Sequence, residues 1–199
     1  MEHPYLMVGL GNPGEDYALT RHNAGFRLAE ALARCWQATW SVEKKFPARL
    51  ARADREGRRV WLCEPLSYMN DSGQVVQAVR AFYQVPLAQM LVVVDDADLP
   101  LGEIRLRGQG GSGGHHGLES ILQHLGARDF PRLRLGIGRT PDGGREITGH
   151  VLGRFSRAEA ARFEKVLERA AQQVDCWLCE GLHKAMSRFN GVVDSEDDL

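Results

Sequence analysis

The chain has 199 residues, 43% of them hydrophobic and 26% charged, a balance that is typical of a folded domain and excludes a disordered chain. No apolar run reaches the about 20 residues of a membrane span, the first residues do not form a secretion signal, and four scattered cysteines do not form a disulfide framework. We therefore expect a cytoplasmic protein, and its net charge of −1 does not by itself point to nucleic acid.

Hydrophobic periodicity divides the N-terminal half of the chain into strands and helices. An apolar run before Gly-Asn-Pro-Gly predicts a strand and a turn, and apolar residues at helical spacing predict helices. Two short runs around Arg-Glu-Gly predict a hairpin. The expected elements are a strand at 5–10, a helix at 24–37, a hairpin of 47–54 and 58–64, a helix at 75–83, and a strand at 90–94 that ends in Asp95 and Asp96.

The C-terminal half continues the alternation of strands and helices. The expected elements are a strand at 103–107, a glycine-rich loop at 108–114, a helix at 118–125, a strand at 133–137, a mobile polar loop at 140–148, a long helix at 163–178 and a last helical segment after Gly181. This order predicts an α/β layered fold with a mixed sheet. We expect a single domain over residues 1–193 and a disordered acidic tail at 194–199.

The turn after the first strand, Gly9–Gly14, formally matches the G-x-G-x-x-G motif of dinucleotide-binding domains. That motif opens directly into a helix and needs an acid about 20 residues later at a strand end, whereas here the helical pattern begins near Ala24 and contains Glu30. A nucleotide-dependent oxidoreductase and a turn without function are two alternatives. Asn12 favours a third interpretation, because open α/β sheets bind ligands at the carboxyl ends of their strands.

Polar groups follow several of the predicted strand ends. His22 suits proton transfer, since an unperturbed imidazole has a pKa of about 6.5, although a lone histidine is more often structural. Asp95 is its natural partner, because an aspartate fixes the ring tautomer and stabilises the imidazolium. No serine or cysteine stands in a G-x-S-x-G context. The attacking group would then be water that His22 activates.

Two segments suggest metal sites as alternatives. The acids in Asp95–Asp98 offer the oxygen ligands that magnesium prefers, but no phosphate-binding lysine or second acidic cluster accompanies them. Cys176, Cys179 and His183 lie along one predicted helix, but a fourth zinc ligand is missing and the cysteines continue an apolar stripe. We expect neither a metal nor another cofactor.

The glycine-rich loop Gly110–Gly114 precedes a helix, where backbone N–H groups can bind an anion or a carbonyl oxygen. A flexible surface loop is the alternative. Arg105 and Arg107 alternate along one neighbouring strand, and Arg132 and Arg134 along another. Alternation places each pair on one face of its strand, where both members can meet phosphates.

Taken together, these segments resemble the bacterial peptidyl-tRNA hydrolase family over about residues 5–190. The motifs that carry the resemblance are GLGNPG, TRHNAG, YMNDSG, DDADLPLG, GGSGGHHGL, RLRLGIG and GHVLG. One of them alone would be weak, but all of them in order at the expected spacing are specific. The resemblance implies a single α/β domain with a twisted mixed β-sheet flanked by helices, which acts as a monomer without a cofactor or an obligate protein partner.

The resemblance also implies a reaction, the hydrolysis of the ester bond between tRNA and a peptide or an N-blocked aminoacyl group. His22 matches the catalytic histidine, and Asp95 matches the aspartate that supports it. Asn12 matches an asparagine that helps distinguish N-blocked from free aminoacyl-tRNA. Our hypothesis is that Asn12 positions the substrate or the water, or stabilises the oxyanion.

Other positions match the substrate-binding residues of the family. Tyr17, Tyr68 and Asn70 correspond to residues that line the substrate site, and Arg107 and Arg134 to basic residues that hold tRNA phosphate. The expected partner is therefore peptidyl-tRNA, bound at its acceptor stem and 3′ end.

His116 departs from the family pattern, because the best-known members carry asparagine after the loop histidine. Both side chains donate hydrogen bonds, but imidazole is larger and titrates, so we expect His116 to contact the substrate in a different manner. The alternative function is a non-catalytic RNA-binding protein on the same scaffold, since plant organelle relatives act in intron splicing. The intact set of His22, Asp95, Asn12 and Asn70 argues against this alternative.

Overall fold

One sheet of eight strands runs through the residues that the computed structural model describes, 3–139 and 147–193. Its strand order is β2-β3-β4-β1-β5-β7-β6-β8. The strands are β1 (Tyr5–Gly9), β2 (Trp40–Val42), β3 (Ala48–Arg55), β4 (Arg58–Pro65), β5 (Met90–Asp96), β6 (Glu103–Arg107), β7 (Arg132–Gly136) and β8 (Gly191–Val192).

The four central strands are parallel and the outer strands are antiparallel to their neighbours. β1 pairs with β4 and β5 in parallel, and β5 pairs with β7 in the same sense. β2, β3 and β4 form an antiparallel meander on one side, and β6 lies antiparallel to both β7 and β8 on the other. The predicted α/β fold with a mixed sheet is confirmed.

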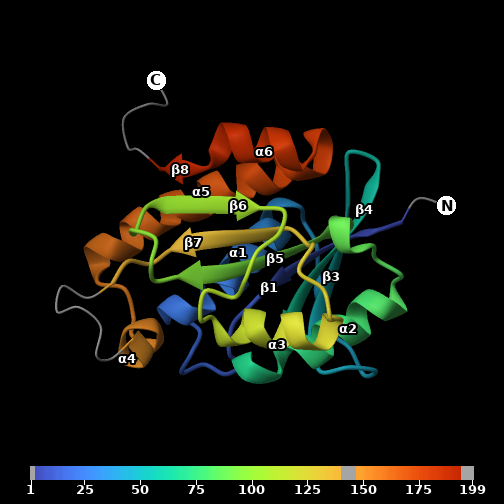
Figure 1. The fold of residues 1–199 in the computed structure, drawn as a ribbon, viewed down its shortest axis with the longest axis horizontal. Helices are drawn as coiled ribbons and strands as arrows, with labels where there is room; N and C mark the ends of the chain where they lie inside the picture. The colour runs from blue at the N-terminus through green and yellow to red at the C-terminus, as the bar shows by residue number, and fades with distance from the viewer. Residues whose placement is uncertain (1–2, 140–146, 194–199) are drawn as a thin grey trace.

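Helices cover both faces of this sheet (Figure 1). The helices α1 (Ala24–Cys35), α5 (Arg157–Glu180) and α6 (Leu182–Phe189) pack on one face, and α2 (Ser72–Phe82) and α3 (His116–Leu125) on the other. The short helix α4 is Ile147–Leu152, and three 3-10 turns are η1 (Arg21–Asn23), η2 (Met69–Asp71) and η3 (Leu87–Gln89). No helix within the described residues is long and apolar enough to cross a membrane.

Side-chain alternation along the central strands feeds two separate hydrophobic cores. Leu91 and Val93 of β5 belong to the core beneath α1 and α5, whereas Val92 and Val94 belong to the core beneath α2 and α3. All four are buried, which explains why β5 is a continuous apolar run: both of its faces are covered.

Two glycines allow α1 to lie unusually close to the sheet. A Cβ atom on Gly25 would come within 2.3 Å of the Leu10 nitrogen and 2.5 Å of the Val93 carbonyl oxygen. A Cβ atom on Gly9 would come within 2.3 Å of the Gly25 carbonyl oxygen. Gly9, the first glycine of the motif, therefore serves packing between helix and strand, and α1 begins well after the turn, as we expected for a motif that does not bind a dinucleotide.

The parallel strands bring distant segments of the chain to one end of the sheet. Asn12 follows the carboxyl end of β1, Asn70 follows that of β4, and Asp95 is the second-last residue of β5. Because parallel strands all end at the same edge, these polar groups converge there.

The last described residues close the β6 edge of the sheet. β8 pairs with Glu103 and Ile104. One step further along, the Asn190 side chain accepts a hydrogen bond from the Leu106 N–H at 2.7 Å and donates one to the Leu106 carbonyl at 3.1 Å.

The structure differs from the predicted elements in three places. Residues 147–148, expected in a loop, begin α4, because Ile147 starts an apolar helical turn; residues 140–146 of that loop and the tail at 194–199 lie outside the described residues. The short strands β2 and β8 were not predicted, since two or three residues carry too little periodicity. The predicted division into a domain of 1–193 and a tail stays a prediction.

Candidate active site

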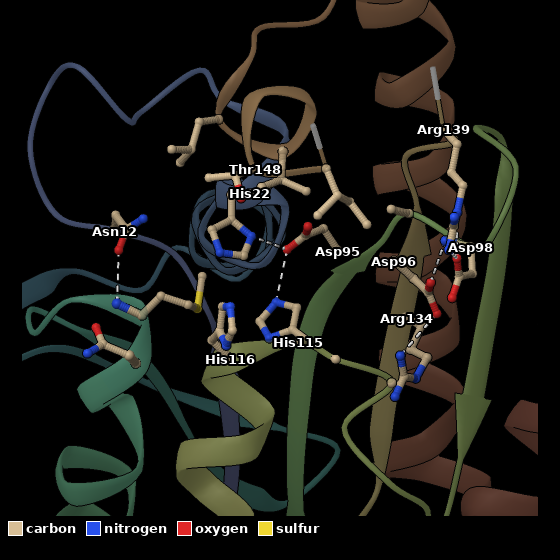
Figure 2. A pocket seen from close by; sticks show the side chains of 18 of the residues that line it. Asn12, His22, Asp95, Asp96, Asp98, His115, His116, Arg134, Arg139 and Thr148 are labelled. Atoms are coloured by element: carbon tan, nitrogen blue, oxygen red, sulfur yellow. Dashed lines mark hydrogen bonds and ion pairs between the residues drawn. The ribbon is translucent and has the colours of Figure 1, made fainter. Parts of the chain in front are cut away.

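His22 and Asp95 meet at the carboxyl end of the sheet. His22 lies in η1, just before α1, and its Nδ1 atom is 2.8 Å from Oδ1 of Asp95, in β5. Asp95 is buried and ionised, so the imidazole donates from Nδ1 and keeps Nε2 as its acceptor. Figure 2 shows the remainder of the ring facing the pocket between Asn12 and His116.

A second histidine, His115, contacts the same carboxylate oxygen. Its Nε2 atom lies 3.0 Å from Asp95 Oδ1, and its Nδ1 atom accepts the Leu118 N–H at 3.3 Å as the N-cap of α3. Because Nδ1 accepts, the ring proton sits on Nε2 and points at Asp95. His22 and His115 therefore both donate to one oxygen atom, with ring centroids 5.1 Å apart.

These contacts keep Asp95 charged. Burial alone raises the pKa of this carboxyl, but His115 and then His22, through the charge that these rings carry at acidic pH and through their hydrogen bonds, hold the pKa at about 2, below its ordinary value. The site thus holds a fixed negative charge beside His22 over the whole neutral range.

His22, Asp95 and His115 also form the single group of potential metal ligands within the described residues, with ligand atoms within 4.8 Å of one another. Their hydrogen bonds fit proton exchange better than metal binding. A metal ion would need a lone pair on His22 Nδ1 and on His115 Nε2, the two nitrogens that now carry protons. The proton of His115 would then move to Nδ1, where it would face the Leu118 N–H. The cysteines of α5 form no such group in the described part of the chain.

Asn12 is held on three sides. Its backbone N–H donates to Asn23 Oδ1 at 2.9 Å, its carbonyl accepts from Asn23 Nδ2 at 3.0 Å, and its side-chain Oδ1 accepts the Met69 N–H at 2.9 Å. The donor N–H of Met69 fixes the orientation of the amide. Asn12 therefore offers N–H donors, from Nδ2, to anything bound in the pocket.

A pocket of about 570 Å³ opens over these groups (Figure 2). Asn12, His22 and Asn70 contribute polar groups to its lining, and α4, which lies beside His22, contributes the apolar side chains Ile147, Val151 and Leu152. The lining residues are Asn12, His22, Tyr68, Met69, Asn70, Asp95, Asp96, Ala97, Asp98, Gly113, Gly114, His115, His116, Arg134, Arg139, Ile147, Thr148, Val151 and Leu152.

Three predicted substrate residues lie at the mouth of this pocket. Tyr68 is 62% exposed, and Asn70 is exposed beside it. His116, at the first turn of α3, has a side chain that is 76% exposed, and its Nδ1 atom lies 3.2 Å from Glu119 Oε2. The neighbouring His115 is buried, so the two consecutive histidines have different surroundings.

Two arginines of β7 hold the glycine-rich loop. Arg134 pairs with Asp96 at 3.0 Å and donates to the carbonyls of Gly111 and Ser112. Arg132 is fully buried and donates to the Gly110 carbonyl, so it does not face solvent where a phosphate could reach it. Of the four alternating arginines, the two on β6, Arg105 and Arg107, are exposed.

Two predicted site residues, Tyr17 and Arg107, do not line the pocket. Tyr17 is half-buried in the turn after β1, where its carbonyl accepts the Thr20 hydroxyl at 2.8 Å. Arg107 is exposed at the end of β6.

Sequence reasoning missed His115 and Asn23. A polar residue directly before a helix is an N-cap candidate, so the sequence could have indicated that His115 caps α3. It carries no sign that the same ring contacts Asp95. Asn23 belongs to the TRHNAG motif, yet nothing in the sequence indicates that its amide binds the backbone of Asn12.

Comparisons with known proteins show which family the chain resembles. The family model described as peptidyl-tRNA hydrolase matches residues 6–197. The peptidyl-tRNA hydrolase of Synechococcus sp. (strain JA-2-3B'a(2-13)) is 51% identical, over 93% of this chain and 82% of the relative. That of Synechocystis sp. (strain ATCC 27184 / PCC 6803 / Kazusa) is 47% identical over 94% and 96%.

The solved structures give the same result. The crystal structure of peptidyl-tRNA hydrolase from Acinetobacter baumannii superposes with a TM-score of 0.91 at 37% identity, covering 98% of this chain and all of the other. A family match over nearly the whole length, relatives near half identity and a shared fold leave one conclusion: the chain belongs to the peptidyl-tRNA hydrolase family.

Proposed function

We propose that this protein hydrolyses the ester bond of peptidyl-tRNA with His22 as general base. The observation that carries the proposal is the 2.8 Å contact between His22 Nδ1 and Asp95 Oδ1, which leaves Nε2 as a proton acceptor on the pocket side. Nε2 takes a proton from water as the water oxygen attacks the ester carbonyl. The bond to the ribose oxygen then breaks, and that oxygen takes the proton back from the His22 imidazolium, so that the tRNA leaves with a free hydroxyl and the peptide with a free carboxyl group.

Asp95 supports this step through its charge. As His22 takes up the proton, the buried carboxylate stabilises the imidazolium and keeps the ring in one orientation. Asp95 stays ionised because its pKa is held at about 2. The mechanism needs no nucleophilic serine, since an alkoxide leaving group departs more readily than an amine.

Asn12 is proposed to contact the reacting carbonyl or the attacking water. Since its Oδ1 is bound to the Met69 N–H, its Nδ2 is the group left to donate, and a donor is what a developing oxyanion requires. Asn70, Tyr68 and His116 are proposed to contact the peptide and the terminal nucleotide at the mouth of the pocket.

Residues beyond the pocket are proposed to bind the body of the tRNA. Arg107 and Tyr17 lie outside the cavity, where the acceptor stem would extend, and Arg134 lies at its border. Contacts of this kind are made to phosphate, so binding would weaken with salt and tolerate different tRNA sequences. We further propose that the protein acts as a monomer in the cytoplasm.

The test compares N-acetylaminoacyl-tRNA with free aminoacyl-tRNA as substrates. We expect tRNA release from the first only, and a loss of kcat on the order of a thousandfold in His22→Ala. His183→Ala, which removes an exposed histidine of α6, is the control and should keep full activity. Equal cleavage of both substrates, or unchanged activity in His22→Ala, would refute the proposal. RNA binding without cleavage would favour the non-catalytic alternative.

A further inference from the structure

The apolar wall of the pocket is a helix with little support of its own. α4 has six residues, and Ile147, Val151 and Leu152 line the cavity. Ile147 is 47% exposed and Leu152 is 39% exposed, so neither is buried in a core. Within the described residues, α4 packs chiefly against η1, the turn that carries His22. Val151 packs against the edge of the core beneath α1 and α5, so the position of this wall depends on that one side chain and on its contact with η1.

Arg21, the residue before His22, supplies that contact. Its Nη2 atom lies 3.1 Å from both carboxylate oxygens of Glu159, and its Nη1 atom is 3.4 Å from the His150 carbonyl at the centre of α4. Its guanidinium also lies over the Phe155 ring, 5.0 Å from the centroid. The Arg21 side chain is 11% exposed and the Glu159 side chain 36%, so the charged pair is partly sheltered from screening on the arginine side.

Backbone contacts join the same three segments. The Arg21 N–H donates to the Gly153 carbonyl at 2.9 Å, and Thr20 forms an isolated antiparallel bridge with Arg154. Gly153 fits tightly here, since a Cβ atom on it would lie 3.0 Å from Arg21 Nη1. These backbone contacts hold η1 beside the residues that follow α4, and the Arg21 side chain adds a contact to α4 itself.

Glu159 provides a rigid anchor for this arrangement. It belongs to α5, the longest helix in the described residues, and completes a capping box with Ser156: its Oε2 accepts the Ser156 N–H at 2.7 Å. The carboxylate is therefore held in place by the helix end before Arg21 binds it.

We propose that Arg21 is a positioning residue that fixes α4 against η1 and so sets the position of the apolar wall of the substrate pocket beside His22. It does not touch the reacting atoms. The guanidinium fork suits this role, because one planar group reaches both the Glu159 carboxylate and the His150 carbonyl, which the single ammonium of lysine does not. This inference rests on the proposed function, because it concerns the pocket of that reaction.

The test separates substrate binding from chemistry. In Arg21→Met, the loss of a charge-assisted contact is expected to raise KM about tenfold while kcat stays within about twofold of wild type. The KM of Arg21→Lys should lie between that of wild type and that of Arg21→Met. Glu159→Gln keeps the capping box, since glutamine serves there equally, but removes the charge that Arg21 binds, so it should raise KM in the same direction.

Ser156→Ala is the matched control, because it removes the hydroxyl that accepts the Glu159 N–H but keeps the Ser156 N–H that holds the Glu159 carboxylate in place. It should lower the thermal midpoint but leave KM unchanged. A readout independent of activity is hydrogen exchange: Arg21→Met should speed exchange at the α4 amides and leave those of β5 unchanged.

The outcomes are distinct. If KM and α4 exchange are both unchanged in Arg21→Met, or if kcat falls while KM does not, Arg21 acts on stability or on His22 and the inference is wrong. A wild-type protein without hydrolase activity would instead refute the proposed function, while the exchange measurement would still test the tether.

Discussion

Asp95 is the residue on which the candidate site is centred, because two imidazole N–H groups donate to the same oxygen atom. His115 performs two functions at once. It caps α3 through Nδ1 and orders the carboxylate through Nε2, so the start of a helix and the position of Asp95, the proposed partner of His22, are linked through one ring.

His115→Asn separates those two functions. Asparagine is among the best N-cap residues, so unfolding free energy should change by less than about 1 kcal/mol. Its short side chain does not reach Asp95, so the carboxylate loses one of two donors, and kcat should fall about tenfold. Steady-state kinetics with N-acetylaminoacyl-tRNA and urea unfolding measure the two effects. An unchanged kcat would mean that His22 alone orders Asp95.

Glu64 presents a different electrostatic situation. It is fully buried in β4, opposite Arg49 of β3, whose Nη1 atom lies 3.1 Å from its Oε2. Burial raises the pKa of Glu64 to about 8, although Arg49 acts in the opposite direction. The carboxyl group is therefore protonated in the folded protein at neutral pH.

This raised pKa makes stability depend on pH. Since the folded pKa exceeds the unfolded value of about 4.3, the contribution of Glu64 is fully present below about pH 4.3 and is lost as pH rises through about 8. Each pH unit in that window should cost about 1.4 kcal/mol. Glu64→Gln should remove this slope, as measured by urea unfolding at pH 5 and pH 8.

The control for that measurement is Glu30→Gln, which changes the other acid near Arg49 at a partly exposed position. It should leave the slope in place. If the free energies of unfolding of wild type and Glu64→Gln differ by the same amount at both pH values, Arg49 keeps Glu64 ionised throughout.

At the scale of elements, the contact between β1 and α1 decides where His22 lies. Gly25 has no room for a Cβ atom, since its nearest neighbours are backbone atoms of Leu10 and Val93 that cannot move independently. η1 precedes α1 directly, so a shift of α1 away from the sheet would also move His22 away from Asp95.

Gly25→Ala tests this dependence. Overpacking against backbone should destabilise the protein by about 3 kcal/mol, and kcat should fall because the 2.8 Å contact between His22 and Asp95 lengthens. Chemical denaturation and kinetics measure both. Gly111→Ala, where a Cβ atom meets nothing within 4 Å, is the control and should change stability by less than about 0.5 kcal/mol. A Gly25→Ala protein of normal stability would show that α1 can move freely.

At the scale of the whole molecule, the fold class followed from the sequence because each central element has a long, unambiguous pattern. The apolar run of β5 and the helical stripe of α5 are examples. The elements that sequence reasoning missed are short or depend on distant partners. β2 forms because β3 lies beside it, and α4 stands against η1, so neither is encoded locally.

The same distinction applies to the site. The proximity of His22 and Asp95 was expected from a motif order and from strand ends that meet at one edge. The contacts of His115 and Asn23 could not be predicted, since a hydrogen bond between side chains 20 residues apart leaves no periodicity in the sequence. The burial of Arg132 was equally hidden, because alternation along a strand does not tell which arginine a loop will cover.

The asparagine that closes the β6 edge has a consequence for association between molecules. An unpaired strand edge is a template for strand addition and aggregation. Here β8 covers Glu103 and Ile104, and the Asn190 amide satisfies both backbone groups of Leu106, as a neighbouring strand would. One side chain thus protects the sheet against adding a foreign strand, next to the exposed Arg107 that we propose for tRNA.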